Sequence, residues 1–414
     1  MSTPRAASGT VQPGSPEHMM SRLLDFEPKQ APFFTLYLDA RVNEHGRRTI
    51  EPFIRKRLYE RARQYAPNTL ERESFDADVV RVNRYLQADV KPPTQGIAIF
   101  ACSAANDFFE AGQFEAPIER NQLFVSDRPH LYPLARLIDQ YRRYAVVVAD
   151  TNCAHIFVFA EGRTLDRKSV QNVKTKHAQI GGWSQNRYQR HVENYHLHHA
   201  KEIVEVLEGT VREDNIEQII LAGDETTIIP LLREQLPKDL LLRVVDQTNL
   251  AIDTPEHDVL EESLKLFRRH DSLTDIQKVQ QLMNEYGADG LAVIGPADTI
   301  AAASNGQAEE ILITATPAKL QYDEAEVNKV LTLYGGDRPA SLDQRSVADE
   351  LVKRATQLSS ARVTFIEDSN VLEDVGGVGA LLRYRISREH AVPYEDGGSI
   401  PQSQALVKEG NRDV

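Results

Sequence analysis

The first third of the chain mixes two hydrophobic patterns, short apolar runs typical of strands and longer stretches with helical spacing. Residues 33–39 and 96–102 are rich in aromatic and β-branched side chains, which favours strands. Between them, residues 71–86 repeat apolar side chains every three or four positions. The predicted elements are strands at 33–39, 96–102, 108–114 and 123–125 and helices at 51–64 and 71–86. Together they predict an N-terminal α/β domain over residues 20–130.

The middle of the chain begins with a short helix and three strands, two of them apolar, and continues into a long amphipathic helix at 187–207. The apolar side of this helix consists of Tyr188, Val192, Tyr195, His199, Ile203 and Val206. The other predicted elements are a helix at 133–144, strands at 145–149, 155–160 and 163–173, a strand at 216–222, a helix at 226–235, a strand at 240–245 and a helix at 255–267. This order predicts a second α/β domain over residues 131–270.

The last part of the chain alternates helices with strands and predicts a third α/β domain over residues 271–388. The predicted elements are helices at 274–286, 296–303 and 347–358 and strands at 290–294, 311–314, 362–366 and 380–386. At the two ends of the chain, the polar segments 1–19 and 389–414 predict a disordered leader and a loose tail. The hydrophobic pattern therefore predicts a three-domain α/β protein.

Composition narrows the class of protein. The 414 residues are 41% hydrophobic and 26% charged, as in ordinary globular proteins. No apolar run reaches the roughly 18 residues of a membrane span, and residues 1–17 lack the apolar core of a signal peptide. The two cysteines, Cys102 and Cys153, lie in apolar runs, so we expect reduced thiols, a cytoplasmic location and no membrane partner. The net charge of −13 argues against a protein that coats nucleic acid generally.

One segment reverses this acidic balance. Between Arg163 and Lys201, eight Lys or Arg residues stand against two acids, and five of the twelve histidines lie here. The polar side of the long helix carries Arg187, Arg190, Asn194, His198 and Lys201, with His191 beside it. A local positive patch on a negative protein suits contact with a polyanion at one place. A solvated helix face without a ligand explains the same pattern, so both interpretations stay open.

The histidines near the middle of the long helix, His196, His198 and His199, do not predict a metal site. No carboxylate or thiol nearby completes a zinc-binding set. His199 falls among the apolar positions, which predicts a core histidine, whereas His198 falls on the basic side. We therefore expect no metal ion.

The residues before the long helix resemble the central domain of archaeo-eukaryotic class I release factors. In that family a Lys-His pair leads into a Gly-Gly-Gln loop at the start of a long helix. This chain has Lys176-His177, followed by Gly181-Gly182-Trp183-Ser184-Gln185. Two residues thus separate the glycines from the glutamine, and the chain is more similar to the bacterial branch of the superfamily, which varies this loop.

Three stretches of the last domain carry a second resemblance, to the last domain of release factors and Pelota. They are residues 288–291, 308–313 and the glycine-rich 375–385. The two resemblances together cover about residues 133–388, and the segment 317–345 departs from the family pattern. They imply an RNase H-like central domain and an L7Ae-like C-terminal domain.

The resemblance also implies a function, binding in the ribosomal A site with the glycine loop against the end of peptidyl-tRNA. Two glycines allow close backbone approach, and a backbone N–H can stabilise the oxyanion that forms as water attacks the ester. The candidate catalytic residues are Gly181, Gly182 and Gln185. The candidate RNA-binding residues are Lys174, Lys176, His177, Trp183, Arg187, Arg190, His191, His198 and Lys201. The implied partners are rRNA, tRNA and a translational GTPase, without a cofactor.

Three hypotheses stay open on function. Gln185 after a double glycine favours a peptidyl-tRNA hydrolase, whereas the bulky Trp183 favours a non-catalytic factor that occupies the A site in rescue or hibernation. The third hypothesis is an RNA-binding adaptor that acts elsewhere. The family's stop-codon motifs do not occur in residues 1–130, which argues against stop-codon reading.

Overall fold

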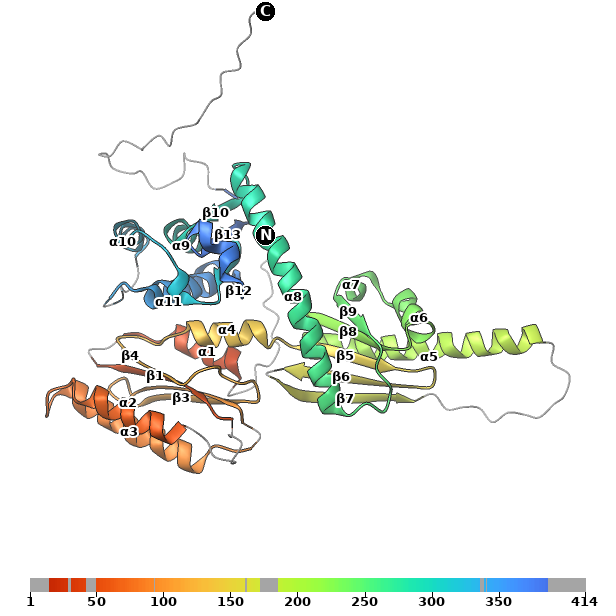
Figure 1. Ribbon diagram of the computed structural model, residues 1–414, viewed down its shortest axis with the longest axis horizontal. Coiled ribbons are helices and arrows are strands. Elements are labelled where there is room, and N and C mark those ends of the chain that lie inside the picture. The colour runs from red at the N-terminus through yellow and green to blue at the C-terminus, as the bar shows by residue number, and fades with distance from the viewer. Residues whose placement is uncertain are drawn as a thin grey trace, which may run out of the picture.

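The computed structural model describes residues 15–28, 31–41, 50–92, 94–160, 162–171, 185–335, 339 and 341–385. Over these residues the chain forms three sheets, each with its own helices, and this confirms the predicted three-domain α/β fold class. Figure 1 shows the N-terminal and C-terminal domains stacked at one end of the molecule, with the central domain beside them.

The N-terminal domain is an antiparallel sheet in the order β3-β2-β1-β4. Its strands are β1 (Phe33–Asp39), β2 (Gly96–Cys102), β3 (Phe108–Phe114) and β4 (Gln122–Ser126), close to the predicted positions. The helices α2 (Ile50–Ala62) and α3 (Leu70–Ala88) cover one face of the sheet. The other face packs against α1 (Pro16–Leu24) and α4 (Tyr132–Gln140).

Helix α1 stands where sequence analysis expects part of a disordered leader over residues 1–19. Its first residue, Pro16, follows Ser15, whose side chain accepts a hydrogen bond from the His18 backbone N–H at 3.3 Å. Met19 and Leu23 are fully buried against the sheet. The expectation of disorder is therefore wrong from residue 16 onwards, because two apolar turns are too short to register as a periodic pattern.

The central domain is a five-stranded sheet in the order β7-β6-β5-β8-β9. The strands β5 (Tyr144–Ala149), β6 (Cys153–Ala160) and β7 (Arg163–Gln171) are antiparallel, whereas β8 (Gln218–Gly223) and β9 (Val244–Thr248) continue in parallel from β5. Helices α5 (Gln185–Glu213) and α6 (Ile228–Gln235) cover one face of the sheet. The strand predicted at 240–245 begins later, because Leu240 belongs to the short helix α7 (Lys238–Leu241).

The two helices predicted at 255–267 and 274–286 form one continuous helix, α8 (Glu256–Gly287). The polar residues 268–272 interrupt the apolar pattern, which explains the false break. This part of α8 runs between two domains (Figure 1), so no single core requires an apolar side there and the helix can be polar. The predicted domain limit at residue 270 falls inside this helix.

The C-terminal domain has a mixed sheet in the order β10-β13-β11-β12. Its strands are β10 (Ala292–Ile294), β11 (Ala308–Thr314), β12 (Arg362–Ile366) and β13 (Val378–Leu382), and only β11 and β12 are parallel. Its helices are α9 (Pro296–Ser304), α10 (Glu324–Leu333) and α11 (Gln344–Arg354), which continues as the π-helical turn Ala355–Ser359. The segment 317–345, which departs from the family pattern, contains α10.

A buried carboxylate joins the N-terminal and C-terminal domains. Asp349 of α11 accepts hydrogen bonds from the backbone N–H groups of Leu131 and Tyr132, both at 2.8 Å, and so caps the start of α4. Its other oxygen lies 2.6 Å from Nδ1 of His130. Around this contact, apolar residues of α1, α4, α9 and α11 form one continuous core. The two domains therefore share a single interior.

Candidate nucleic-acid interface

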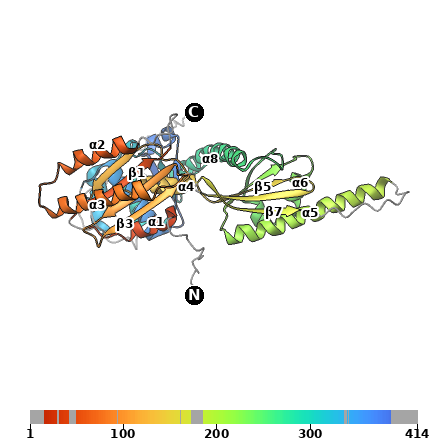
Figure 2. The same ribbon diagram turned by 90° about the horizontal axis from the view of Figure 1, so that it is seen from below.

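Where the structure describes its side chains, helix α5 is buried against the central domain over its second half. Its fully buried side chains in the described part begin at His199 and include Ile203, Leu207 and Val211. The residues just before, from Asn194 to His198, are exposed or half-buried. At about 1.5 Å per residue, the half that begins at Gln185 is about 20 Å long, and Figures 1 and 2 show it extending past the edge of the sheet. We call this half the α5 arm.

The predicted catalytic loop connects β7 to the α5 arm. Gln185 is the first residue of α5. Gly181 and Gly182 lie outside the described residues, as do four predicted RNA-binding residues, Lys174, Lys176, His177 and Trp183. The structure therefore places the two ends of this loop, Gln171 and Gln185, and leaves the roles of its residues as predictions.

The remaining predicted RNA-binding residues lie on α5. Arg187, Arg190 and His191 belong to the arm, and their side chains lie outside the description. The side chain of His198 is 72% exposed, with Nε2 at 3.5 Å from a carboxylate oxygen of Glu202 one turn later. Lys201 is exposed. The structure thus brings the basic positions of α5 together on one continuous helix.

His199 differs from its neighbour His198 in environment. The ring is fully buried, which confirms the prediction of a core position, although neither ring nitrogen has a hydrogen-bond partner among the described residues. Burial lowers the pKa of His199, so the imidazole is neutral at pH 7. A neutral, buried ring cannot contact a phosphate.

The cations of β7 are engaged with the rest of the domain. Lys168 Nζ lies 2.7 Å from a carboxylate oxygen of Glu213, near the end of α5, and this hydrogen bond raises the pKa of Lys168. The guanidinium of Arg167 stacks over the Phe157 ring at 5.1 Å from its centroid. Both cations count in the positive segment of the sequence, but they lie on the sheet and away from the arm. The basic surface is therefore smaller than the sequence suggests.

The turn after β8 shows how closely the centre of this sheet is packed. Gly223 has φ of +145°, and a Cβ atom there would lie 2.1 Å from the Ala149 carbonyl oxygen of the neighbouring strand β5. The next residue, Asp224, accepts hydrogen bonds from the backbone N–H groups of Thr226 and Thr227 at 2.7 and 3.0 Å. The hydrogen bond from the Thr226 hydroxyl at 2.6 Å, together with these backbone bonds, lowers the pKa of Asp224. The backbone bonds also satisfy donors ahead of α6. Asp224 acts as a local cap.

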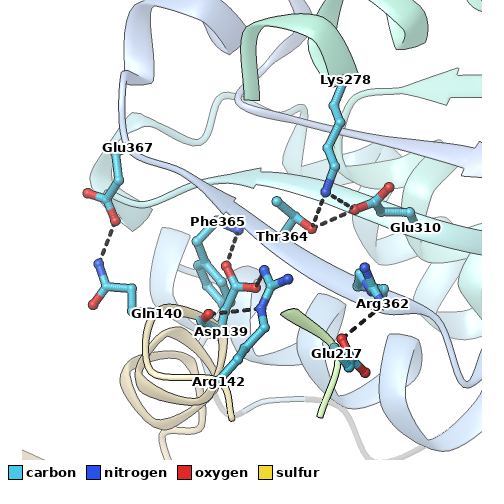
Figure 3. A network of polar contacts seen from close by, with 10 residues as sticks. All are labelled: Asp139, Gln140, Arg142, Glu217, Lys278, Glu310, Arg362, Thr364, Phe365 and Glu367. Carbon is cyan, nitrogen blue, oxygen red and sulfur yellow. Dashed lines mark hydrogen bonds and ion pairs between the residues drawn. The ribbon is translucent and has the colours of Figure 1, made fainter. Parts of the chain in front are cut away.

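The base of the central domain meets the other two domains at a polar junction (Figure 3). Asp139 at the end of α4 pairs with Arg142 and accepts a hydrogen bond from the Phe365 backbone N–H of β12 at 3.0 Å. Arg362 of β12 pairs with Glu217, just before β8, at 3.2 Å. Sequence analysis does not identify this junction, because its partners are far apart in the chain and each is an ordinary charged residue.

Within the described residues, no group of three or more His, Cys, Asp or Glu side chains could hold a metal ion. In the same part of the chain, none of the helices has the length and apolar character needed to cross a membrane.

Comparison with known families gives a match over the central domain. Residues 129–268 match the sequence model of bacterial archaeo-eukaryotic release factor family 10. This segment runs from the end of the N-terminal domain into α8 and contains the loop and the α5 arm. The resemblance drawn from the glycine loop is therefore confirmed over the central domain. No curated protein matches the chain in sequence.

Several solved structures resemble the chain at low sequence identity. An archaeal translation termination factor, aRF1, is 15% identical, with 89% of this chain and 97% of that chain covered and a TM-score of 0.24. Dom34 of S. cerevisiae, described as interacting with Hbs1, is 12% identical, with 70% and 79% covered and a TM-score of 0.39. A model of ribosome-bound archaeal Pelota and ABCE1 is 14% identical, with 91% and 96% covered and a TM-score of 0.40. At these TM-scores the likeness gives no basis for transferring a function.

Proposed function

We propose that this chain, release-factor-like in its central domain, binds the ribosomal A site and brings the loop before α5 to the end of peptidyl-tRNA. The observation that carries the proposal is the α5 arm. The arm is about 20 Å long and runs past its own sheet, and its sequence contributes Arg187 and Arg190 to the positive segment of a protein with net charge −13. An arm of this kind can enter a narrow, RNA-lined space while the bulk of an acidic protein stays outside.

The chemistry proposed for the loop needs no protein nucleophile. Gly181 and Gly182 would let the backbone approach the ribose and the ester of peptidyl-tRNA. A backbone N–H would stabilise the oxyanion that forms when water attacks the ester carbonyl. Gln185, at the first position of α5, would order the site and exclude nucleophiles larger than water. In this proposal Lys174, Lys176, His177 and His191 contact the surrounding RNA phosphates.

Ribosome co-sedimentation tests the binding step. We expect the double variant Arg187→Glu/Arg190→Glu to lose at least tenfold in affinity for the ribosome. The two reversals change the net charge by four units at a surface proposed to face phosphates. The matched control is Arg212→Glu/Arg233→Glu, which makes the same charge change at the far end of α5 and on α6. Equal binding by the two variants would remove the arm from the interface, and wild-type protein that does not co-sediment would end the proposal.

The second candidate function is a non-catalytic factor that occupies the A site during rescue or hibernation. The observation in its favour is Trp183, which follows the double glycine where the family has Gln. An indole there can stack on a nucleotide and hold the factor in place. Single-turnover release of peptide from stalled ribosomes separates the two candidates. Loss of release in Gln185→Ala and Gly182→Ala, but not in Asn186→Ala, supports hydrolysis, whereas no release by the wild type supports the occupant.

A translational GTPase is the proposed partner of the C-terminal domain, for which the resemblance implies an L7Ae-like fold. The test is co-sedimentation of a translational GTPase with ribosomes that carry this chain, in the presence of a non-hydrolysable GTP analogue. We expect the chain to increase the amount of GTPase retained on the ribosomes. Equal retention without the chain would exclude this partner.

A further inference from the structure

Helix α2 of the N-terminal domain is a second positive surface on this acidic protein. Its sequence from Ile50 to Ala62, with Arg63 just after it, contains five basic residues, Arg55, Lys56, Arg57, Arg61 and Arg63, and two acids, Glu51 and Glu60. The neighbouring helix α3 covers the same face of the sheet with three arginines and four acids, Glu71, Glu73, Asp76 and Asp78. The positive charge is therefore particular to α2.

The basic residues of α2 lie opposite its buried side. Ile50, Ile54 and Leu58 pack into the core under the sheet at a spacing of four residues. On the outer side, Arg55, Tyr59 and Arg63 follow the same spacing, and Lys56 is exposed beside them. These four residues, which we call the α2 ridge, line a hollow in the surface. The spacing puts one aromatic ring between two arginines.

Tyr59 is the unusual member of the α2 ridge. The residue is 66% exposed, although tyrosine normally buries most of its ring. The Arg63 guanidinium lies over this ring, 5.6 Å from the centroid. An exposed ring with cations on both sides is the arrangement on which a nucleic-acid base can stack while its phosphates are neutralised.

The acids of α2 leave the cations of the α2 ridge available. Arg57, on the flank of the helix, forms an ion pair with Glu60, with Nη1 at 3.4 Å from Oε2. Both side chains are about half exposed. Among the residues that the structure describes, neither Arg55 nor Lys56 makes an ion pair. By contrast, Arg72 of α3 pairs with Asp76 at 2.7 Å, and Arg81 stacks on Phe109 at 4.8 Å. Arg72 and Arg81 of α3 make contacts within the domain, whereas Arg55 and Lys56 of the α2 ridge face solvent.

We propose that the α2 ridge is an RNA-binding surface, in which Arg55, Lys56 and Arg63 contact phosphates of one strand and a base stacks on Tyr59. An anionic membrane is the poorer fit, because a helix that lies on a membrane inserts an apolar face, and the apolar face of α2 is occupied by the sheet. In both views of the molecule, α2 and the tip of α5 lie at opposite ends of the long axis (Figures 1 and 2). One partner that contacts both surfaces must span the whole protein, as a ribosome would, and to that extent the inference rests on the proposed function.

Fluorescence anisotropy with a labelled single-stranded oligouridine tests the phosphate contacts. The full chain is used in the Arg187→Glu/Arg190→Glu background, so that the arm contributes little. We expect Arg55→Ala/Lys56→Ala to weaken binding about tenfold and to reduce the salt slope of log Kd by about 1.4, at about 0.7 per lost contact. The control Arg84→Ala/Lys91→Ala removes two exposed charges from α3 and the loop after it. Equal weakening by the control would overturn the inference.

Two variants of Tyr59 test the stacking. Tyr59→Phe keeps the ring and should bind like the parent, whereas Tyr59→Ala should bind about fivefold or more weakly. An exposed side chain can be removed without unfolding the domain, which circular dichroism checks. If Tyr59→Ala binds oligouridine like the parent, or if the parent prefers phosphatidylserine vesicles to RNA, the surface is not an RNA site.

Ribosome co-sedimentation separates this inference from the proposed function. If the inference holds within the proposed function, Arg55→Ala/Lys56→Ala weakens ribosome binding as well as oligouridine binding. If ribosome binding depends on the arm and is unaffected by α2 variants, the proposed function stands and the α2 inference fails. If the chain binds oligouridine through α2 but ignores ribosomes, the α2 surface stands and the proposed function fails.

Discussion

The three domains are joined in two different ways. Between the N-terminal and C-terminal domains, Asp349 and His130 lie in a continuous apolar core, and their side chains are 12% and 7% exposed. Between the C-terminal and central domains, the Arg362–Glu217 ion pair is about half exposed, and the backbone of α8 runs from one to the other. Buried and fully hydrogen-bonded contacts fix a geometry, whereas exposed ion pairs contribute little. The N-terminal and C-terminal domains therefore share a core, whereas the Arg362–Glu217 contact of the central domain is open to solvent.

This difference suits a protein whose contacts lie at its two ends. The two domains that share this core present the α2 ridge at one end, while the central domain carries the α5 arm at the other (Figure 1). The orientation of the arm then depends on α8 and on the polar junction of Figure 3. Variants at Asp349 and at Glu217 each affect one of these two contacts without the other.

The largest effect is expected from Asp349→Ala. Removal of this carboxylate leaves two backbone donors of α4 and the ring of His130 without their partner. Breaking such a buried set costs about 3–5 kcal/mol of the free energy of unfolding. Chemical denaturation measures the loss, and Asp349→Asn should lose less because it keeps an acceptor oxygen. Asp374→Ala, at an exposed position of the same domain, is the control; equal losses in both variants would contradict the buried joint.

A smaller loss is expected from Gly223→Ala, which affects the central domain alone. The added Cβ would meet the Ala149 carbonyl oxygen at 2.1 Å, and the φ of +145° is unfavourable for alanine. We expect a loss of about 2–3 kcal/mol, measured as reduced hydrogen-exchange protection of β5 and β8. Gly209→Ala is the matched control, because nothing lies within 4 Å of that position inside α5. It should instead stabilise the helix by about 0.5–1 kcal/mol. The same sign for both would contradict the packing described.

Asp275 of α8 is expected to make the stability of the protein depend on pH. It lies close enough to Lys278 and Asp139 of the polar junction to feel their charges. Burial and the nearby Asp271 raise the pKa of Asp275 to about 6, above the value of about 3.9 in an unfolded chain. A carboxyl with a raised folded pKa favours folding when it is protonated, so stability is gained as pH falls through about 6 and is lost as pH rises. Asp275→Asn should therefore be more stable than wild type at neutral pH, by on the order of 1 kcal/mol after solvent screening.

Thermal denaturation of wild type and Asp275→Asn across the pH range checks this expectation. The difference in Tm should shrink as the pH falls from about 6 and approach zero below about 3, where the carboxyl is protonated in both states. Asp253→Asn, at an exposed position before α8, should show no such trend. A difference that grows at low pH would show that the sign is wrong.

The smallest effect is expected from Glu217→Ala at the other joint. The two side chains of the Glu217–Arg362 pair are 49% and 53% exposed, so the pair contributes about 0.5 kcal/mol or less. Small-angle scattering should nevertheless detect a broader range of molecular dimensions if the pair restrains the central domain. A large loss of stability would mean that this joint is as firm as the buried one.

The sequence predicts the strands better than the joints. The runs at 33–39, 96–102 and 362–366 coincide with β1, β2 and β12, because each is apolar, β-rich and bounded by turn residues. The single helix α8 is predicted as two, since its polar middle has no local pattern to mark it as helical. Helix α1 is not predicted, because its few apolar residues form a core only together with the sheet that covers them.

The candidate site divides in the same way. The glycine loop and the basic side of α5 can be recognised from residue types at fixed spacing. Both lie within residues 129–268, which match the family model. Whether Lys168 serves the surface is not visible, because its partner Glu213 is far along the chain. The α2 ridge is also missed, although the run Arg55-Lys56-Arg57 is a signal for it. That run becomes informative only when Ile54 and Leu58 are known to face the core.

Local order was determined by the sequence itself: where apolar residues alternate or recur every three or four positions, strands and helices form, and the glycine loop precedes a long helix. Tertiary structure decided what lies next to what. It made one interior out of two domains through Asp349, and it left the first half of α5 beyond the sheet. The physical reason is that periodicity acts between neighbours in the chain, whereas burial, ion pairing and the exposed fraction of a side chain depend on residues hundreds of positions away.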